Sequence, residues 1–528
     1  MKDYLKKAMQ GGLWIQPICF IAMLNIAYSA NHDNLLSLGT WIASFVFSFV
    51  PILLIMMEKM NKPSSENARG EHEKKRAMYP DVPQELLFDT PTGIMFGMWK
   101  GKYVCLDISR YDGHQFIIGG SGSGKSSTLL INTILANPDA RIMALDIKGE
   151  LSYKAKKLTD DRLVIFNPQD RNAWGYNPLY ALHEDSTMQE ILEVMQTITF
   201  SLISMSASSD GDFWKQSARN YLLGLLLYFY NTKEMHDFIQ IVDAMFSKSA
   251  SELVAEVMEQ ADPSSLEYKY MVGFSTMEDV TLGGIVGEVN SHILIFSTDE
   301  DIRYAFRYND RKASPQMLED GYSIFLSIRE EKLSAYNNIL QLIINQTLST
   351  LETRQEDSEP ILFLIDELGR ICSEGRITKL QDALRTLRSR KVRCILATQS
   401  IEGLRNSYSE DEIWDMVSNC NYISVLSATS IKTQEAVCKW CGRYEVRKKS
   451  WSGEGKERKS NVSFDKEDIV EPSDLITLPM TGEAILINPF SGYCRIKKSP
   501  YYKDRYFRPM ADEIRKYNDD VMEIRKGE

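Results

Sequence analysis

The sequence predicts an α/β fold built on a largely parallel β-sheet. Short apolar runs of the kind that form buried strands recur along the chain, and stretches with helical periodicity separate many of them. Because a parallel connection needs a crossover, which is usually a helix, this alternation is typical of parallel sheets. The expected strands lie at residues 116–118, 142–145, 163–166, 323–328, 361–365, 394–397, 423–426 and 484–487.

A glycine-rich loop follows the first of these strands. Residues 119–126 read GGSGSGKS, and a helix-compatible stretch comes directly after them. Glycines let the backbone curl so that its N–H groups point at the phosphates of a nucleotide, with the positive end of a helix behind them. Lys125 is expected to reach the β- and γ-phosphates, and Ser126 to hold Mg²⁺. The expected nucleotide contacts are Gly119, Gly120, Ser121, Gly122, Ser123, Gly124, Lys125, Ser126 and Ser127.

A second half of the site is expected where the run ILFLI at 361–365 ends in two carboxylates. Five consecutive apolar residues suit a strand that is buried on both faces, and ligands bind at the carboxyl ends of parallel strands. Asp366 is therefore expected to hold Mg²⁺ with Ser126. Glu367 is expected to polarise the water that attacks the γ-phosphate, which favours an ATPase over a protein that only binds nucleotide.

Two further residues are candidates for catalysis. Gln399 follows the apolar strand VRCILAT and could sense the γ-phosphate. Several arginines precede that strand in LRTLRSRKVR, and most of them are expected to form a solvated helix face. In an oligomer, Arg388 could instead reach the nucleotide of a neighbouring subunit, because phosphoryl transfer needs positive charge near the transition state.

Composition limits the remaining possibilities. A chain of 528 residues that is 44% hydrophobic fits two or three folded domains and excludes a disordered protein. The net charge of −11 argues against general adhesion to nucleic acid, so any DNA contact must be local. The 8 scattered cysteines fit reduced thiols, and Cys438 and Cys441 are expected to lie on a helix face rather than to bind zinc.

The amino terminus is expected to be a membrane anchor. Residues 13–30 and 35–57 are long apolar stretches, each long enough to cross a bilayer as a helix. Lysines and arginines flank the outer ends of the pair but not the tetrapeptide that joins the two stretches, so both ends should stay in the cytoplasm. A cleaved signal peptide is the rival interpretation, but export would separate the nucleotide site from ATP.

The expected organisation divides the chain into four parts. A transmembrane hairpin occupies 1–62, and the nucleotide-binding domain occupies 63–184 and 295–528. Between them, 185–294 shows helical periodicity without a convincing strand, which predicts an all-α insertion. The aromatic and leucine stripe at 213–230 is expected to be core.

The stretch 439–459 combines lysines and arginines with Trp440, Tyr444 and Trp451. Such a mixture could grip a phosphate backbone and stack on bases. Glycines and glutamates are interspersed, so a solvated loop is the alternative, and it is slightly favoured.

Several segments together resemble one family, the coupling proteins of type IV secretion and conjugation systems (the TraG/TraD class of membrane-anchored ATPases). They are GGSGSGKSS, LDIKGEL at 145–151, the NPL triplet at 177–179, FWKQSARNYL, LIDELGR, LATQS and the closing EAILIN…YYKDRYF. The loop and the Asp-Glu strand are common to many ATPases, whereas their combination with DIKGEL, NPL and FWKQSARNYL is more specific.

This resemblance implies a P-loop (RecA-like) motor that binds ATP and Mg²⁺ and works as a homo-hexamer at the cytoplasmic face of the bacterial inner membrane. It implies a multi-pass anchor and a helical domain beside the substrate entrance. The implied partners are single-stranded DNA, relaxase or effector proteins, and components of the secretion channel. Asp146 and Lys148 of DIKGEL are expected at the rim of the site, and the family's glutamine and arginine sensors carry over to Gln399 and Arg388.

Two other functions remain open. A DNA pump of the chromosome-segregation type (FtsK/HerA-like) shares the P-loop, the Asp-Glu strand and a terminal ATQ strand, but should have a larger membrane region and a winged-helix DNA reader. A recruitment receptor that does not hydrolyse nucleotide is the third possibility, although Lys125, Asp366 and Glu367 speak against it.

Overall fold

The computed structural model describes residues 79–205, 212–373, 375–452 and 459–527. Contacts divide the chain after Tyr79, and the unit Pro80–Glu528 contains the α/β fold. The anchor expected within 1–62, with its two apolar stretches, lies outside the described residues.

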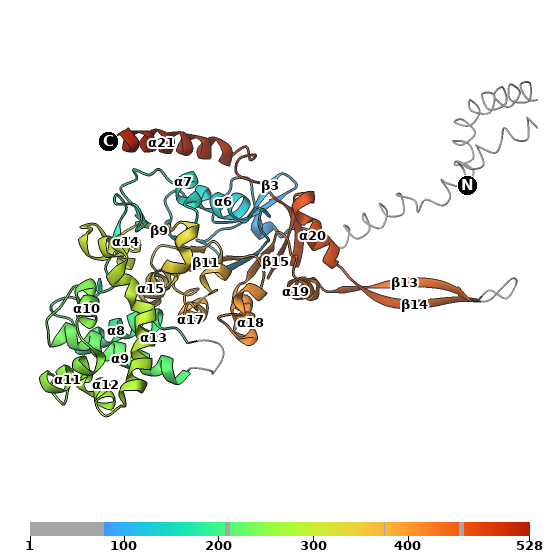
Figure 1. Ribbon diagram of the computed structural model, residues 1–528. Coiled ribbons are helices and arrows are strands. Elements are labelled where there is room, and N and C mark those ends of the chain that lie inside the picture. The colour runs from blue at the N-terminus through green and yellow to red at the C-terminus, as the bar shows by residue number, and fades with distance from the viewer. Residues whose placement is uncertain (1–78, 206–211, 374, 453–458, 528) are drawn as a thin grey trace, which may run out of the picture. The chain divides into compact units, whose positions relative to one another are not determined.

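The centre of the fold is a 12-stranded sheet (Figure 1). In spatial order it contains β1 (Leu87–Phe88), β3 (Lys102–Leu106), β2 (Ile94–Trp99), β16 (Gly492–Lys497), β15 (Glu483–Asn488), β12 (Tyr422–Val425), β4 (Gln115–Ile118), β11 (Val392–Thr398), β10 (Ile361–Ile365), β5 (Arg141–Leu145), β9 (Ser323–Leu326) and β6 (Leu163–Phe166). The strands from β12 to β6 are parallel, and those from β1 to β15 are antiparallel. Each of the apolar runs predicted from the sequence forms a strand of this sheet.

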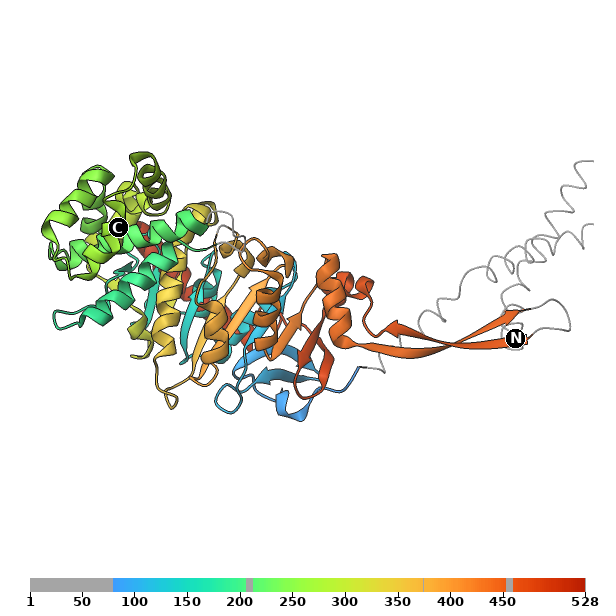
Figure 2. The same ribbon diagram turned by 90° about the horizontal axis from the view of Figure 1, so that it is seen from below.

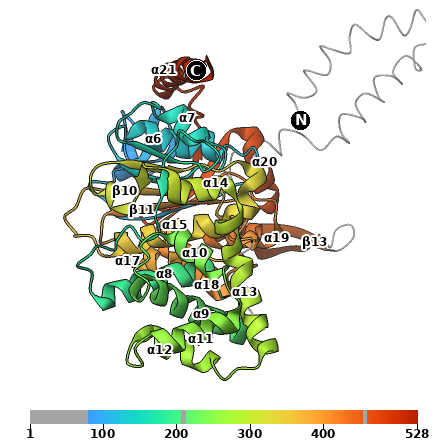
Figure 3. The same cartoon turned by 60° about the vertical axis from the view of Figure 1, so that its left-hand side comes forward.

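Helices cover both faces of the parallel strands, which explains why β4, β10 and β11 are buried along their whole length. On one side lie η3 (Lys125–Leu130), α6 (Ile131–Ala136), α7 (Glu150–Ala155) and α21 (Phe507–Gly527) (Figures 1 and 3). On the other lie α15 (Leu333–Glu352), α17 (Leu380–Thr386) and α18 (Glu410–Asn419). Shorter or more peripheral elements are η2 (Gln84–Leu86), η6 (Pro315–Leu318), η7 (Glu330–Lys332), α16 (Leu368–Ile371), η8 (Glu402–Leu404), α19 (Ile431–Cys441), α20 (Pro472–Thr481) and the pair β7 (Gly175–Tyr176) and β8 (Lys312–Ala313).

Of the antiparallel strands, only β15 was predicted from the sequence, and β1, β2, β3 and β16 were not. Strands β2 and β3 form a hairpin whose turn residues, Lys100 and Gly101, both have positive φ, 47° and 87°. Positive φ at both central residues is the requirement of a type I′ turn, whose backbone twist matches the twist of the two flanking strands. Cys438 and Cys441 are buried on α19, as expected of helix-face residues.

Helices gather in a block beside the sheet (Figures 1 and 3). The block contains α8 (Met188–Leu202), α9 (Asp212–Asn231), α10 (Phe238–Met245), α11 (Ala250–Gln260), α12 (Leu266–Met271), η4 (Val272–Phe274), α13 (Asp279–Thr298), α14 (Glu300–Arg303) and η5 (Tyr304–Tyr308). Capping boxes at Thr187 and Ser249 begin α8 and α11, because each side chain satisfies a free backbone N–H. The leucines of α9 are core, but Phe213 and Trp214 are 60% and 42% exposed. The expectation that this whole stripe is core was wrong for its first turn, where Trp214 lies over Gly284 instead.

Among the described residues, α13 alone is long and apolar enough to cross a membrane. In this structure it packs against α9 and α10 within the helical block.

A long antiparallel ribbon follows α19 in the chain and extends away from the sheet (Figures 1 and 2). It consists of β13 (Arg443–Ser452) and β14 (Lys459–Asp468), which pair from Arg443↔Asp468 to Ser452↔Lys459. The favoured interpretation of 439–459 as a solvated loop was therefore wrong. Residues 439–441 end a helix, and most of the remaining stretch is paired strand.

Candidate nucleotide-binding site

The glycine-rich loop joins β4 to η3 at the carboxyl edge of the parallel strands. Its backbone conformation depends on its glycines. A Cβ on Gly119 would stand 2.4 Å from Ser123 Oγ, and Gly124 has a φ of +100°, which L side chains rarely adopt. The loop is anchored to β11 because Gly119 N donates to Thr398 O at 3.0 Å. A side chain at Gly119 or Gly124 would therefore distort the loop that has to curl around an incoming phosphate.

Lys125 begins the helix and lies inside the loop with its side chain only 6% exposed. Its Nζ donates to Gly119 O at 2.7 Å and lies 3.2 Å from Glu367 Oε1. The ammonium group is therefore held between the loop and the acidic end of β10, where it can contact a phosphate bound between them.

Ser126 and Asp366 meet across the site. Ser126 Oγ donates to Asp366 Oδ2 at 2.9 Å, while Asp366 Oδ1 is buried without a hydrogen-bond partner among the described residues. Burial raises the pKa of Asp366 to about 6, and the hydrogen bond from Ser126 opposes this shift. An unpartnered carboxylate oxygen beside a hydroxyl oxygen is the kind of hard donor set that Mg²⁺ prefers, so these residues fit the predicted metal role.

Glu367 and Gln399 complete the group. Gln399 Nε2 donates to Glu367 Oε2 at 3.1 Å, and Glu367 N donates to Ala397 O at 3.2 Å. Glu367 has a φ of 98°, an uncommon value for a residue with a side chain. Strained backbone of this kind is concentrated at functional sites, where neighbouring contacts hold it in place.

The order of the strands explains why these residues converge. Strand β11 lies between β4, which leads into the loop, and β10, which ends in the acidic pair. Neighbouring strands are about 4.8 Å apart, so the backbones of β4 and β10 are about 10 Å apart. The side chains that follow them meet across this gap, in the Ser126–Asp366 and Lys125–Glu367 pairs. Gln399 directly follows β11, the middle strand of these three, and so lies between the glycine-rich loop and the acidic pair.

Arg388 lies elsewhere. It precedes β11 and is therefore on the opposite edge of the sheet, about 20 Å from the loop of the same chain by the rise of a strand. Its side chain is exposed and makes no hydrogen bond or ion pair with any residue in the described ranges. Its carbonyl accepts from Nη1 of Arg393 at 3.0 Å. Arg393 is buried in β11, so among the arginines of LRTLRSRKVR it is an exception to the expected solvated helix face.

The DIKGEL residues also differ in part from expectation. Asp146 is 2% exposed and accepts from the N–H groups of Leu151 and Ser152 at 3.1 and 2.8 Å, so it caps α7. Burial raises the pKa of Asp146, and its charge contributes to the raised pKa of Asp366. Asp146 is thus a buried support rather than a rim residue, whereas Lys148 is exposed and lines a small cavity with Glu330.

Two residues at the loop were missed from the sequence. Ser427 Oγ accepts from Gly120 N at 2.8 Å, and Lys498 Nζ donates to Ser123 O at 3.0 Å and to Leu426 O at 2.9 Å. Ser427 follows a buried strand, which is a recognisable signal, but nothing in the sequence shows that this strand neighbours β4. Lys498 carries no local signal of its role.

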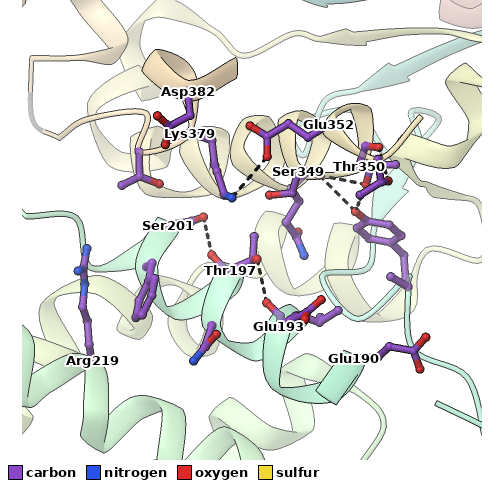
Figure 4. A pocket seen from close by; sticks show the side chains of 18 of the residues that line it. Glu190, Glu193, Thr197, Ser201, Arg219, Ser349, Thr350, Glu352, Lys379 and Asp382 are labelled. Carbon is purple, nitrogen blue, oxygen red and sulfur yellow. Dashed lines mark hydrogen bonds and ion pairs between the residues drawn. The ribbon is translucent and has the colours of Figure 1, made fainter. Parts of the chain in front are cut away.

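A separate cavity of about 850 Å³ lies between α8 of the helical block and α15, which covers one face of the sheet (Figure 4). Acidic groups such as Glu193 and Glu352 and basic groups such as Arg219 and Lys379 line it, and Lys379 pairs with Glu352 at 3.5 Å. None of the loop residues 119–127 contributes to it. It is therefore distinct from the nucleotide site.

Comparison with known proteins agrees with this geometry. A family model described as type IV secretory system conjugative DNA transfer matches residues 58–524. Protein VirD4 of Rhizobium rhizogenes is 20% identical over 430 residues, which cover 79% of this chain and 62% of the relative. The conjugal transfer protein TraG of Agrobacterium fabrum is 20% identical over 395 residues, which cover 71% and 58%. The chain thus matches only about three fifths of the length of these relatives.

Solved structures of the bacterial conjugative coupling protein TrwB share the fold. The unbound form matches with a TM-score of 0.59 at 16% identity, covering 81% of this chain and 91% of TrwB. TrwB with the non-hydrolysable ATP analogue ADPNP matches with a TM-score of 0.60 at 17% identity, covering 81% and 92%. TrwB has also been solved with ADP and Mg²⁺. Since the family model covers most of the chain, this protein belongs to the type IV secretory system conjugative DNA transfer family, whose members are the type IV coupling proteins.

Proposed function

We propose that this chain is a membrane-anchored ATPase that couples ATP hydrolysis to the transfer of DNA–protein or protein substrates through a type IV secretion channel. The observation that carries the proposal is the convergence of the loop, Lys125, the Ser126–Asp366 pair, Glu367 and Gln399 at one edge of the sheet. A protein that only recruited substrates would not need the Glu367 carboxylate and the Gln399 amide to lie together where the γ-phosphate is expected.

Each residue has a defined task in this proposal. The N–H groups of residues 119–127 and the Lys125 ammonium bind the phosphates, and Ser126 with Asp366 would hold Mg²⁺. Bound Mg²⁺ would neutralise charge on the phosphate oxygens. Glu367 accepts a proton from the attacking water, and Gln399 keeps the Glu367 carboxylate oriented and can donate to the γ-phosphate.

The remaining parts of the proposal concern assembly and partners. Exposed Arg388 is assigned to the nucleotide of a neighbouring subunit in a homo-hexamer, where it would stabilise negative charge in the transition state. The transported partner is single-stranded DNA with its relaxase, or an effector protein, and the receiving partner is the secretion channel. The anchor is the pair of apolar stretches at 13–30 and 35–57, which would place the motor at the inner membrane.

ATPase activity of the purified full-length chain, with and without single-stranded DNA, tests the proposal. Lys125→Ala and Glu367→Gln should each lower the rate on the order of 10²-fold or more, because each removes a group that acts in the transition state. Glu356→Gln makes the same charge change at an exposed position and should leave the rate unchanged. Equal ATPase rates in the native protein and these three variants would overturn the proposal of an ATPase motor. A recruitment receptor that does not hydrolyse nucleotide would then be the alternative.

A further inference from the structure

The segment 498–504, which follows β16, is attached directly to the glycine-rich loop. Lys498 Nζ donates to the carbonyls of Ser123 and Leu426, at 3.0 and 2.9 Å. Three residues later, Tyr501 N donates to Ser127 O at 2.9 Å. The segment therefore contacts both the middle of the loop and the first turn of the helix behind it.

Further hydrogen bonds fix the segment in position. Asn132 Nδ2 donates to Ser499 O at 2.8 Å, and the hydroxyl of Tyr103 donates to Asp504 Oδ1 at 2.9 Å. Asp504 also accepts from Ser499 Oγ, which closes the segment on itself. Contacts to three separate elements make its backbone a rigid wall beside the loop rather than a free tail.

The order of the strands shows which end of a nucleotide would face this wall. Asp366, Glu367 and Gln399 lie at the ends of β10 and β11, on one side of β4, so the γ-phosphate belongs on that side. The sugar and base are at the opposite end of the polyphosphate. They must therefore lie on the other side of β4, towards β12, β15 and β16, from which the 498–504 segment emerges.

This wall presents an aromatic ring. Tyr502 is 50% exposed, and its ring stands nearly perpendicular to that of Tyr501, with centroids 5.4 Å apart at 89°. Tyr501 packs against the core, so Tyr502 is supported by a fixed neighbour, and Lys503 Nζ lies over one face of the Tyr502 ring, 5.8 Å from the centroid. Purine bases stack on such faces, and the position of this ring is set by the same backbone that contacts Ser127.

We propose that the 498–504 segment forms the base-binding wall of the nucleotide site and that the Tyr502 ring stacks on the purine of the bound nucleotide. This inference rests on the proposed function, because it names a residue of the same ATP site. Stacking uses the flat face that every purine has, so it adds affinity without reading the edge of the base. ATP and GTP should therefore bind with affinities within about threefold of each other.

Equilibrium binding of Mg-ATP and of Mg-tripolyphosphate, which lacks a base, tests the assignment in the full-length protein. Tyr502→Ala should weaken ATP binding about tenfold and leave tripolyphosphate binding unchanged. Tyr502→Phe keeps the aromatic face and should bind ATP like the native protein. Tyr308→Ala removes a similarly exposed tyrosine, 56% exposed, from the helical block and should change neither affinity.

A direct readout of stacking is the fluorescence of 2-aminopurine riboside triphosphate, which stacking quenches. The native protein and Tyr502→Phe should quench it, and Tyr502→Ala should not. Native ATP affinity in Tyr502→Ala, or equal losses for ATP and tripolyphosphate, would overturn the base-binding wall while leaving the ATPase intact. Failure of the native protein to bind either probe would instead overturn the proposed function and this inference with it.

Discussion

Lys125 Nζ lies 3.2 Å from Glu367 Oε1, so the cation that is expected to bind phosphate is paired with the carboxylate that is expected to activate water. The Lys125 side chain is 6% exposed and that of Glu367 is 18% exposed, so solvent screens this pair only weakly. Gln399 holds the other oxygen of the same carboxylate, at 3.1 Å. Glu367 thus joins the two halves of the site, as the hydrogen bond from Ser126 to Asp366 also does.

Glu367→Gln should separate binding from hydrolysis. The amide keeps the shape of the carboxylate but cannot accept the proton of water, so kcat should fall on the order of 10²- to 10⁴-fold. Lys125 would lose its charged competitor, so the Kd for ATP should stay the same or decrease. Isothermal titration with ATP alongside steady-state turnover measures both quantities. A large rise in Kd with turnover preserved would contradict the assigned roles.

Gln399→Ala should lower kcat about 10²-fold and change the Kd for ATP by less than about threefold, because it removes one donor near the developing charge. Gln355→Ala, an exposed glutamine after α15, serves as the control and should behave like the native protein. Steady-state ATP hydrolysis at saturating ATP measures the effect. Full activity in the Gln399 variant would remove this residue from the catalytic group.

Arg388→Ala should abolish most ATP hydrolysis if the arginine acts on the nucleotide of a neighbouring subunit. Mixing this variant with inactive Lys125→Ala subunits should restore part of the activity, since some interfaces then combine an intact loop with an intact arginine. Arg385→Ala removes a nearby arginine that pairs with Asp415 at 2.9 Å, and it should retain activity. A mixture that stays inactive would argue against action between subunits.

The buried histidine His114 should make stability depend on pH. Burial, followed by the charge of Arg393, lowers its pKa from 6.5 to about 4, so the folded protein keeps it neutral. The unfolded chain takes up a proton below about pH 6.5. The His114 contribution is therefore fully present above pH 6.5 and is lost as the pH falls towards 4, by about 3 kcal/mol in total.

Urea unfolding of the native protein and of His114→Gln at several pH values between 4 and 8 measures this effect. The variant should show a shallower loss of unfolding free energy between pH 6.5 and 4. Parallel curves for the two proteins over that interval would show that His114 does not titrate in this way.

The β13–β14 ribbon allows a test of contact with nucleic acid, which the sequence left open as the less favoured interpretation of 439–459. Replacing Arg447, Lys448 and Lys449 by glutamine should weaken binding of single-stranded DNA and reduce the slope of log K against log salt by about 2. A matched variant with Arg508, Arg515 and Lys516 replaced by glutamine makes the same charge change on α21 and should have a smaller effect. Equal effects of the two triple variants would indicate general electrostatics rather than a contact at the ribbon.

The parts of the fold that are set by residues close together in the chain could be predicted from the sequence. The apolar runs became strands because burial on both faces selects uninterrupted apolar residues, as in β10. The glycine-rich loop and the Asp366–Glu367 pair were recognisable because their chemistry lies in adjacent residues. The antiparallel strands β2 and β16 were missed for different reasons. In β2, Gly97 interrupts the apolar run, and glycine weakens a strand pattern. In β16 only Cys494 and Ile496 are buried, so its alternation is short.

By itself, therefore, the sequence determined the apolar strands of the sheet, and it predicted which residues carry phosphate and metal chemistry. Only the tertiary structure decided that β11 lies between β4 and β10, which brings Gln399 to Glu367, and that Lys498 reaches Ser123 of the loop across 375 residues. The physical reason is that strand formation and loop curvature arise from local sterics and burial. Strand order and long-range hydrogen bonds arise from packing among segments that are far apart in the chain.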